Sequence, residues 1–372
     1  MSANISRKDF LRKVGRTVAG GSMVSALGFP SILVPREQQT LGVALLGLGS
    51  YAGGQLAPGL QKTEHCELRG IVTGSPEKIP RWQQRYDISD NNVYTYETMD
   101  ELANNDEIDV VYVVTPPGLH AKYAIAAAET GKHVWCEKPM AMNVEECRSI
   151  IKATDRNGVE LMIGYRLQHE PNTQRIMEWA EQEPYGPIQE LKTGAGYSGY
   201  HGADSWRRDA ELGGGALYDM GVYPINAARY ATGMEPVAVR GRQWSERDIY
   251  DEVDEFTEFE LRFPGGVVAK GETSFGKSTN YLRVDCADGW YNLEPFQSYS
   301  GVQGETSDGK QLPPAGGDQQ ARQMDDDALA IKKGKDPLAP GEEGLRDIRI
   351  VKAIEESSEK GRAWIELQDL EI

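Results

Sequence analysis

Short apolar runs alternate with helix-favouring stretches through the first half of the chain. The apolar runs cover residues 41–47, 66–72, 108–114, 133–136 and 159–163. The helix-favouring stretches between them cover residues 52–61, 76–86, 119–130 and 144–157. Buried strands that alternate with helices are typical of a doubly wound parallel sheet, because each crossover helix covers a sheet face. We therefore predict an α/β domain of the Rossmann type.

The pattern changes in the second half of the chain, where apolar and charged positions begin to alternate. Phe259, Leu261 and Phe263 are each separated by one charged residue. Such alternation predicts antiparallel strands with one face on the core and the other in water. Further strands are expected at 267–275 and 281–286, and helices at 319–332 and 342–359. We expect a Rossmann domain over 36–164 and a C-terminal α+β domain with an open, mostly antiparallel sheet over 165–372.

Composition narrows the possible functions. The chain has 372 residues, and its 40 basic against 57 acidic side chains give a formal charge of −17. This length suits two domains that each bury a core. An acidic chain is repelled by phosphate backbones, so nucleic-acid binding is not expected. We find no apolar stretch long enough to cross a bilayer, so stable membrane insertion is not expected either.

The N-terminus departs from this acidity. Residues 1–40 hold six basic and two acidic side chains, a net charge of +4. Arg7 and Lys8 precede a mildly apolar stretch over 18–34, which is the layout of an export signal. With Lys in place of the second arginine, the pattern resembles a twin-arginine signal. We expect residues 1–35 to direct export to the periplasm; the alternative is an amphipathic N-terminal helix on a cytoplasmic protein.

No metal site is expected from the sequence. The cysteines are scattered without a CxxC pair, which is neither a metal-ligand pattern nor a small disulfide framework. They are Cys66, Cys136, Cys147 and Cys286. The acidic run over 246–260 holds eight carboxylates, but it continues into an alternating strand. Such a run is typical of a solvated sheet face.

A glycine-rich turn follows the first predicted strand. It reads Gly47-Leu48-Gly49-Ser50-Tyr51-Ala52 and opens the first predicted helix. In such a turn the first glycine permits a tight bend, the second lets backbone approach a pyrophosphate, and the alanine keeps the helix close to the strand. This position in a strand-helix-strand unit is the context that the dinucleotide motif requires. We therefore expect Gly47, Gly49, Ser50, Tyr51 and Ala52 to contact a dinucleotide.

The end of the second predicted strand indicates which dinucleotide binds. An NAD enzyme usually presents Asp or Glu there to the ribose 2′-hydroxyl. The chain instead has Thr73 and Ser75, followed by Glu77 and Lys78. Hydroxyls and a cation suit a 2′-phosphate, so we predict NADP, with NAD as the alternative. Glu77 is expected in the first turn of the next helix, where an anion is favourable; an ordinary solvated helix charge is the alternative for Lys78.

Three further sequence blocks resemble one known family. They are TPPGLH at 115–120, GKHVWCEKPM at 131–140 and GGGALYDMGVY at 213–223. Together they look like the signatures of the glucose-fructose oxidoreductase and inositol dehydrogenase family, and the resemblance extends over about residues 41–365. Many members carry His where this chain has Tyr223, and the tyrosine resembles the glucose-fructose oxidoreductase branch.

The resemblance implies a pair of catalytic residues. It places Lys138 beside the nicotinamide, with Tyr223 nearby. Removing a hydride from a sugar carbon requires a base for the hydroxyl proton. Tyrosine has an ordinary pKa of about 10, and a nearby ammonium would favour its phenolate. We expect Tyr223 to exchange the proton, and Lys138 to be its electrostatic partner and a substrate contact.

Other residues are assigned to the sugar and to the cofactor. Asp219 precedes Tyr223 by four residues and would share its helix face, orienting a sugar hydroxyl, although the helix could instead begin at Pro224. Trp206 and Arg207 are expected to line the sugar pocket, with a core or interface aromatic as the alternative for Trp206. The resemblance places cofactor contacts at Thr115, Pro116, His120, Glu137, Lys138 and Arg166.

The activity implied by the resemblance is oxidation of an aldose to its lactone by tightly bound NADP, coupled to reduction of a ketose. The segment 29–40 is short and has only two prolines, which does not suit a long arm that wraps a neighbouring subunit's cofactor. An ordinary xylose or glucose dehydrogenase with exchangeable cofactor is therefore the alternative, and a non-catalytic dinucleotide sensor is a second one. The open sheet implies a homodimer or homotetramer.

Overall fold

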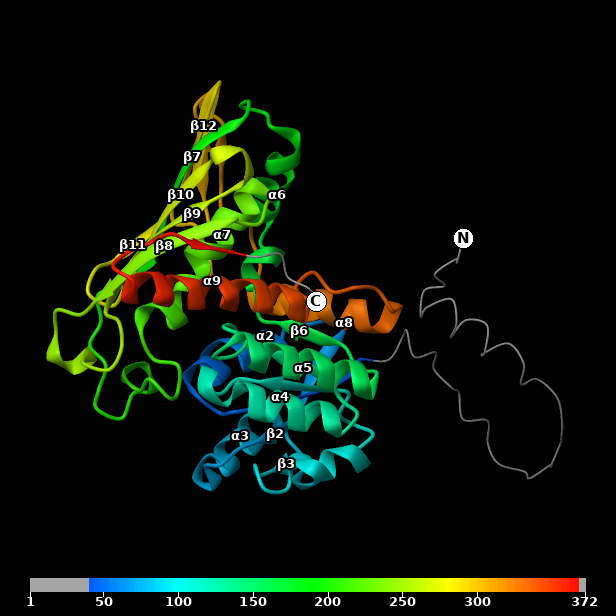
Figure 1. Cartoon of the computed structure of the whole chain (residues 1–372). Coiled ribbons are helices and arrows are strands. Elements are labelled where there is room, and N and C mark those ends of the chain that lie inside the picture. The colour runs from blue at the N-terminus through cyan, green and yellow to red at the C-terminus, as the bar shows by residue number, and fades with distance from the viewer. Residues whose placement is uncertain (1–39, 368–372) are drawn as a thin grey trace, which may run out of the picture. The chain divides into compact units, whose positions relative to one another are not determined.

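The apolar runs of the first half form one parallel sheet in the computed structural model, which describes residues 40–367 (Figure 1). The strands are β1 (Leu41–Leu46), β2 (Cys66–Val72), β3 (Val93–Tyr94), β4 (Val110–Val113), β5 (His133–Cys136) and β6 (Leu161–Ile163). Their order is β3-β2-β1-β4-β5-β6, the order of a dinucleotide-binding sheet, so the predicted Rossmann fold is confirmed. The predicted export signal, residues 1–35, lies outside the described residues.

Helices cover both faces of this sheet. They are the π-helical turn η2 (Ala52–Leu56), α2 (Ala57–Leu60), α3 (Ile79–Tyr86), α4 (His120–Glu129) and α5 (Val144–Asn157). Alternate residues of β4 enter two separate cores: Val111 packs with α4 and α5, whereas Tyr112 packs with η2 and α3. The strand order reverses between β1 and β4, and such folds bind ligands at the carboxyl ends of the strands at that point.

A second, larger sheet forms from the rest of the chain. Its strands are β7 (Ile188–Gly196), β8 (Ala238–Trp244), β9 (Phe256–Arg262), β10 (Val268–Ser274), β11 (Thr279–Cys286), β12 (Gly289–Leu293), β13 (Gly304–Thr306), β14 (Gln311–Leu312) and β15 (Ile365–Glu366). Their order is β14-β13-β12-β11-β7-β10-β9-β8-β15. Strands β7 and β10 pair in parallel, and the other described pairs are antiparallel. The predicted mostly antiparallel sheet is therefore confirmed.

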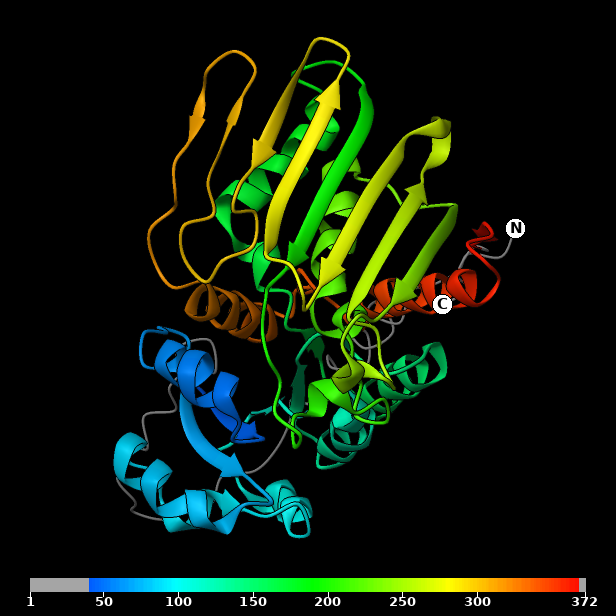
Figure 2. The same ribbon diagram turned by 90° about the vertical axis from the view of Figure 1, so that its left-hand side faces the viewer.

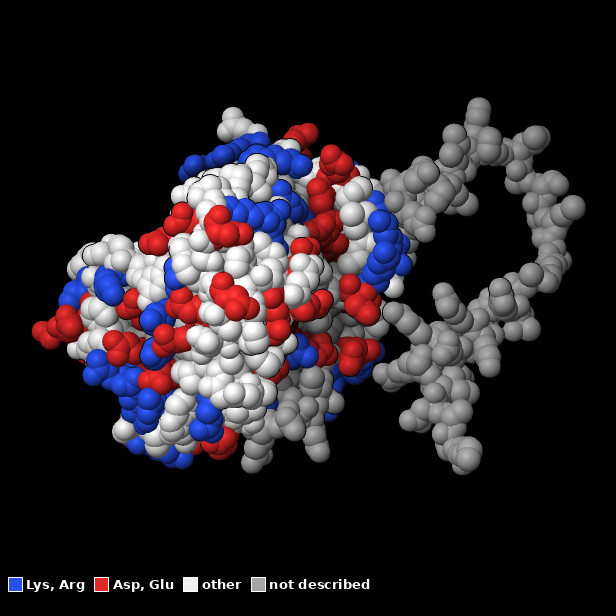
Figure 3. Space-filling model, turned by 90° about the horizontal axis from the view of Figure 1, so that it is seen from above, with Lys and Arg blue, Asp and Glu red and all other residues white. Residues whose placement is uncertain are grey.

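The two faces of this sheet differ as the alternating pattern predicts. Phe259 and Leu261 are buried, whereas Glu258 and Glu260 lie on the opposite, wetter face. Helices α6 (Pro171–Gln182) and α7 (Val222–Thr232) lie behind the sheet in Figure 2, whose viewer-facing side no described helix covers. From above, Lys and Arg side chains are interspersed with Asp and Glu rather than gathered in one basic area (Figure 3).

Two late helices return to the first half of the molecule. Helix α8 (Gln319–Lys333) packs Met324 and Ala328 into the core that holds Leu45 of β1. Helix α9 (Gly341–Glu359) lies between the two sheets, in contact with α5, β6 and β8 (Figure 1). The C-terminal part of the chain therefore contributes directly to the walls of the Rossmann domain.

Candidate active site

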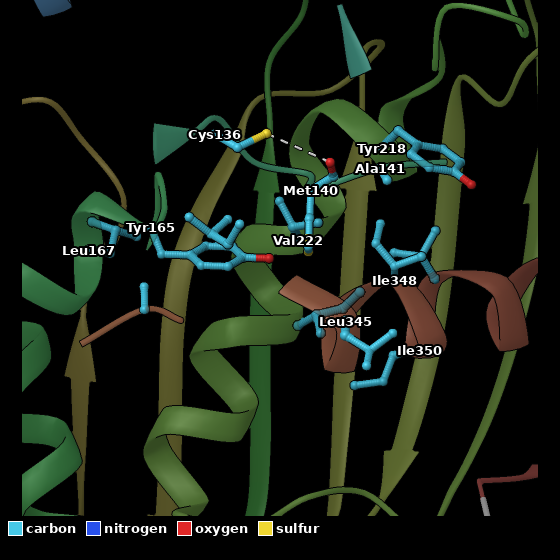
Figure 4. Close-up of a cluster of buried hydrophobic side chains, with 14 of the residues drawn as sticks. Cys136, Met140, Ala141, Tyr165, Leu167, Tyr218, Val222, Leu345, Ile348 and Ile350 are labelled. Carbon is cyan, nitrogen blue, oxygen red and sulfur yellow. Dashed lines mark hydrogen bonds between the residues drawn. The ribbon is translucent and has the colours of Figure 1, made fainter. Parts of the chain in front are cut away.

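The carboxyl end of β5 carries the Glu137-Lys138-Pro139 segment out of the parallel sheet. A buried apolar cluster joins β5, α7 and α9 behind this segment, with Cys136, Val222 and Leu345 among its members (Figure 4). Close packing leaves such a core little freedom to shift. The backbone that carries Lys138 is thus held in place by three elements far apart in the sequence.

The structure brings Lys138 and Tyr223 together. The Lys138 Nζ atom lies 4.5 Å from the centroid of the Tyr223 ring. The same ammonium donates a hydrogen bond of 2.9 Å to the backbone oxygen of Asp219. Because this acceptor belongs to the helix that carries Tyr223, the bond fixes the cation relative to the phenol.

Tyr223 lies on one continuous stretch of helix. The π-helical turn η9 (Leu217–Gly221) runs directly into α7, whose second residue is Tyr223. The helix therefore does not begin at Pro224, and the alternative in which Asp219 and Tyr223 lie on separate elements is wrong. Pro224 lacks a backbone N–H, so it donates no hydrogen bond to the turn that precedes it.

Two cations act on the Tyr223 phenol. Burial raises the pKa of Tyr223, but the charges of Lys138 and Arg166 outweigh burial and the nearby Glu137 carboxylate, so its pKa is lowered from the ordinary value. The Arg166 Cζ atom lies 5.4 Å from the ring centroid. A phenol with a lowered pKa is a better base near neutral pH, which is what proton exchange with a hydroxyl requires.

Glu137 is a buried carboxylate beside this pair. It accepts a hydrogen bond of 2.7 Å from Tyr112 Oη, and burial raises its pKa. A Cβ atom added to Gly164 would lie 2.6 Å from Glu137 Oε1. The glycine therefore leaves room for the carboxylate, which is 6% exposed.

The side chain of Asp219 forms hydrogen bonds with two other side chains of the protein. Its Oδ2 atom accepts hydrogen bonds from Arg207 Nε at 2.8 Å and from Tyr197 Oη at 3.2 Å. The Arg207 guanidinium also stacks 4.5 Å from the Trp206 ring centroid. The carboxylate is thus paired within the protein, and the side chain of Arg207 is 33% exposed against 10% for that of Asp219.

His120 is buried rather than open to a ligand. Its Nδ1 lies 2.8 Å from the Pro139 oxygen and its Nε2 lies 2.8 Å from the Thr115 oxygen. Burial lowers its pKa to about 4, so the ring is neutral at physiological pH. The expectation of a direct cofactor contact is not met, because both ring nitrogens face backbone carbonyl oxygens, and the neutral ring donates to one of them. His120 thus lies between the segment after β4 and the segment after β5.

The glycine-rich turn has the space that a dinucleotide needs. Gly47 has a φ of +99°, and an added Cβ would lie 2.7 Å from the Val114 oxygen, so glycine is required there. Gly49 and Ser50 are exposed, and a Cβ on Gly49 would meet no atom within 4 Å. Backbone approach by a pyrophosphate is therefore unobstructed.

Tyr51 and Ala52, the last two residues of the glycine-rich motif, contact other parts of the fold. Ala52 is fully buried, as close packing of helix on strand requires. The Tyr51 Oη atom accepts a hydrogen bond of 3.4 Å from Gln320 on α8, and the Tyr51 ring lies 6.1 Å from the Tyr299 ring. The C-terminal part of the chain therefore borders the glycine-rich turn as well.

Lys78 reaches over the glycine-rich turn. Its Nζ atom donates a hydrogen bond of 3.2 Å to the Leu48 oxygen, which places the ammonium between the end of β2 and the glycine-rich turn. Thr73 is buried and its Oγ1 accepts from the Ser75 amide at 3.0 Å, so it shapes the turn after β2. Among these residues, the half-exposed Ser75 and the cation of Lys78 are available to a ligand.

The residues after β4 also fit a nicotinamide cofactor. The Thr115 Oγ1 atom is buried and has no hydrogen-bond partner among the described residues. A buried polar atom without a partner is costly, and a bound group that donates or accepts there would satisfy it. Pro116 is half-buried and extends the chain past the same point. The turn, the cation and this hydroxyl together fit a phosphorylated dinucleotide.

Helix α8 supplies contacts that sequence reasoning misses. Gln319 Oε1 accepts a hydrogen bond from Arg166 Nη1, and Gln323 Nε2 donates one of 3.2 Å to Tyr112 Oη. Both glutamines are buried. The sequence signal that could have indicated these contacts is the glutamine-rich start of a predicted helix, QQARQ at 319–323. Nothing in the neighbouring residues indicates that this helix faces the Rossmann domain.

Residues 40–367 contain no group of three or more His, Cys, Asp or Glu side chains arranged to hold a metal ion. In the same range, helices that are both long and apolar enough to cross a membrane are absent. The four cysteines are free and buried.

Comparisons with known proteins place both halves of the chain. Residues 41–165 match the oxidoreductase family with an NAD-binding Rossmann fold, and residues 173–292 match the GFO/IDH/MocA C-terminal domain. The D-xylose 1-dehydrogenase [NADP(+)] of Haloarcula marismortui is 31% identical over 340 residues, which are 85% of this chain and 90% of the relative. The scyllo-inositol 2-dehydrogenase (NADP(+)) of Bacillus subtilis is 25% identical, over 88% of this chain and 96% of its own.

A solved structure is similar over nearly the same length. The aldose-aldose oxidoreductase from Caulobacter crescentus, crystallised with glycerol, superposes with a TM-score of 0.85 and is 36% identical. The match covers 88% of this chain and 100% of that one. Both halves of the fold, and not the Rossmann domain alone, are therefore shared with sugar-converting enzymes.

Proposed function

The chain belongs to the GFO/IDH/MocA family of NAD-binding oxidoreductases, and on this premise we propose that it oxidises an aldose at C1 to the lactone with NADP. The observation that carries the proposal is the pairing of Lys138 with Tyr223 at the carboxyl end of β5. A non-catalytic dinucleotide sensor would not need a phenol with a cation held over its ring.

The residues divide the reaction between them. NADP, when bound, supplies the acceptor for the hydride that leaves C1. Tyr223, as phenolate, takes the proton of the C1 hydroxyl, so the C–H and O–H bonds break and a carbonyl forms. Lys138 stabilises the phenolate and contacts the reacting oxygen. Arg207, held by Asp219, presents donors to a more distant sugar hydroxyl.

Lys78 should select NADP over NAD. We expect Lys78→Met to weaken NADP binding roughly tenfold, because one hydrogen bond to a charged group contributes roughly 1.5 kcal/mol. NAD binding should change little, since NAD has no 2′-phosphate. Isothermal titration calorimetry with each nucleotide would measure both affinities. Arg85→Met, an exposed charge at the far end of α3, is the matched control; an equal loss for both nucleotides would contradict the assignment.

We further propose that NADP stays bound through the catalytic cycle and is recycled by a second sugar, which is reduced. The similarity to an enzyme named aldose-aldose oxidoreductase supports this over an ordinary dehydrogenase. The test is to purify the protein without added nucleotide, denature it and assay released NADP. One equivalent per chain supports recycling, whereas an empty protein that requires added NADP supports the ordinary dehydrogenase.

Export and assembly complete the proposal. The twin-arginine-like signal over 1–35 would deliver a folded enzyme with bound NADP to the periplasm, and cell fractionation with and without Arg7→Ala tests it.

The uncovered sheet face carries Trp244 stacked on Phe256 and Arg242 at 4.4 Å from the Trp244 ring. Trp and Arg are enriched at protein interfaces, which supports association of two chains through this face, measurable by light scattering.

A further inference from the structure

Arg166 is a buried cation without an anionic hydrogen-bond partner. It lies on the short turn η7 (Arg166–His169) and is 2% exposed. Its guanidinium donates to the Ser298 oxygen at 2.7 Å, to Gln297 Oε1 at 3.2 Å and to Gln319 Oε1. All three acceptors are neutral, and no carboxylate within residues 40–367 forms an ion pair with it.

The other deeply buried arginine among residues 40–367 has a different environment. Arg229 is 4% exposed and forms ion pairs with the carboxylates of Glu235, Glu343 and Asp347. Buried charges are ordinarily paired, because an isolated charge is costly in a medium of low dielectric constant. The contrast indicates that an anion other than a carboxylate balances Arg166.

The Tyr223 ring lies beside that guanidinium. Five ionisable groups from other elements surround the phenol: Lys138, Arg166, Glu137, Tyr51 and Tyr299. Asp219, on the helix of Tyr223 itself, is already paired with Arg207. Two cations and one carboxylate thus remain, which leaves one positive charge. An ionised phenol at Tyr223 would balance it.

We propose that Arg166 is the buried counter-ion of the Tyr223 phenolate and that Gln319 is the positioning residue that holds it there. Arg166 acts on the reaction through the Tyr223 phenol, and the proposal assigns it no contact with the sugar. This inference rests on the proposed function, because it gives the acid–base residue a second cation besides Lys138. The lowered pKa of Tyr223 has the direction that the arrangement requires.

The chemistry of Gln319 suits this role. An amide oxygen accepts the guanidinium hydrogen bond without adding charge, whereas a glutamate in the same place would pair with Arg166 and cancel its field at Tyr223. The start of α8 is also firmly fixed. Its N-cap, Asp318, accepts from the Ala321 amide at 3.0 Å and pairs with Lys62 at 2.7 Å.

Gln319→Glu separates the electrostatic role from a merely structural one. The variant keeps the shape and the hydrogen bond, so the thermal unfolding midpoint should be unchanged or higher. Tyr223 should nevertheless ionise at higher pH, the acid limb of the kcat profile should move upward, and kcat at neutral pH should fall roughly tenfold with little change in KM. Tyrosinate absorbance of the protein without sugar gives the titration directly, with Tyr223 identified by difference from the same variant carrying Tyr223→Phe.

Two further variants complete the test. Arg166→Met removes the cation and leaves only neutral groups behind, so it should shift the Tyr223 titration in the same direction even if Gln319→Glu does not fold. Gln182→Glu makes the same change at an exposed position at the end of α6 and should shift nothing.

The outcomes separate the inference from the proposed function. If Tyr223 titrates in Arg166→Met, and in any folded Gln319→Glu, as it does in the wild type, the counter-ion proposal is overturned. If the wild type oxidises no sugar, the proposed function fails, while the tyrosinate titration, which uses no substrate, still supports or overturns the role of Arg166.

Discussion

Tyr223→Phe should abolish sugar oxidation while leaving NADP binding nearly unchanged. The substitution removes only the phenolic oxygen, which lies on a ring 4.5 Å from the Lys138 ammonium. General acid–base catalysis by one positioned side chain contributes about 10²–10⁴-fold, so we expect kcat to fall by that factor. Because the Phe ring fills the same space, KM should change much less. Steady-state kinetics with an aldose, together with nucleotide titration, measures both quantities.

A tyrosine on the same helical segment provides the control. Tyr218 is buried and donates one hydrogen bond of 2.7 Å to the Met142 oxygen, away from the Lys138–Tyr223 pair. Tyr218→Phe should therefore reduce stability slightly and keep kcat. Near-normal turnover in Tyr223→Phe, or an equal loss in both variants, would refute the role assigned to Tyr223.

Arg229→Met should produce the largest loss of stability. The guanidinium pairs with Asp347 at 2.7 Å and with Glu343 at 2.8 Å, and so joins α7 to α9. Asp347 is fully buried and Glu343 is 6% exposed. Removing one partner of a buried ion pair leaves an uncompensated charge and typically costs about 3–5 kcal/mol. Chemical denaturation of the purified variant would measure the change in the free energy of unfolding.

The deficit should depend on pH. With Arg229 present, the pKa of Glu343 is lowered, whereas burial raises the pKa of Asp347 to about 7 despite the arginine. Removal of the arginine should leave both carboxylates with a folded-state pKa above the unfolded value, so the folded variant should bind more protons than the unfolded chain. Its stability then falls as pH rises through that range, and the deficit should shrink toward acidic pH. Arg262→Met removes a pair with Glu366 on the surface and should cost no more than about 1 kcal/mol. Equal losses at all pH values would show that shape, not charge, explains the effect.

Local sequence patterns predict elements well but do not predict contacts between residues that are far apart along the chain. Local signals predict strands such as 66–72 and the helix 144–157 with the bounds that the structure has, because apolar period and capping residues are local properties. Strand β3 carries no such signal, since its two residues pair only because β2 is already in place. The π-helical turn before Pro224 also depends on packing rather than on local preference.

Charge pairing is likewise decided in three dimensions. The sequence shows that Asp219 and Arg207 are present, but it does not show that their side chains form an ion pair. Nor does it show that His120 is buried between two backbone carbonyls. Such partners are separated along the chain, and their distance is fixed only when sheets and helices pack.

By itself the sequence determined the Rossmann domain, the sheet with alternating apolar and polar positions, and the motifs that contain the glycines, Lys138 and Tyr223. Each of these features depends on residues that are neighbours along the chain. Only the tertiary structure decided that α8 returns to the Rossmann domain with Gln319 against Arg166, and that Arg166 lies beside Tyr223. The physical reason is separation: Arg166 and Gln319 are 153 positions apart along the chain. A contact of that kind depends on how whole layers pack, and no local pattern encodes it.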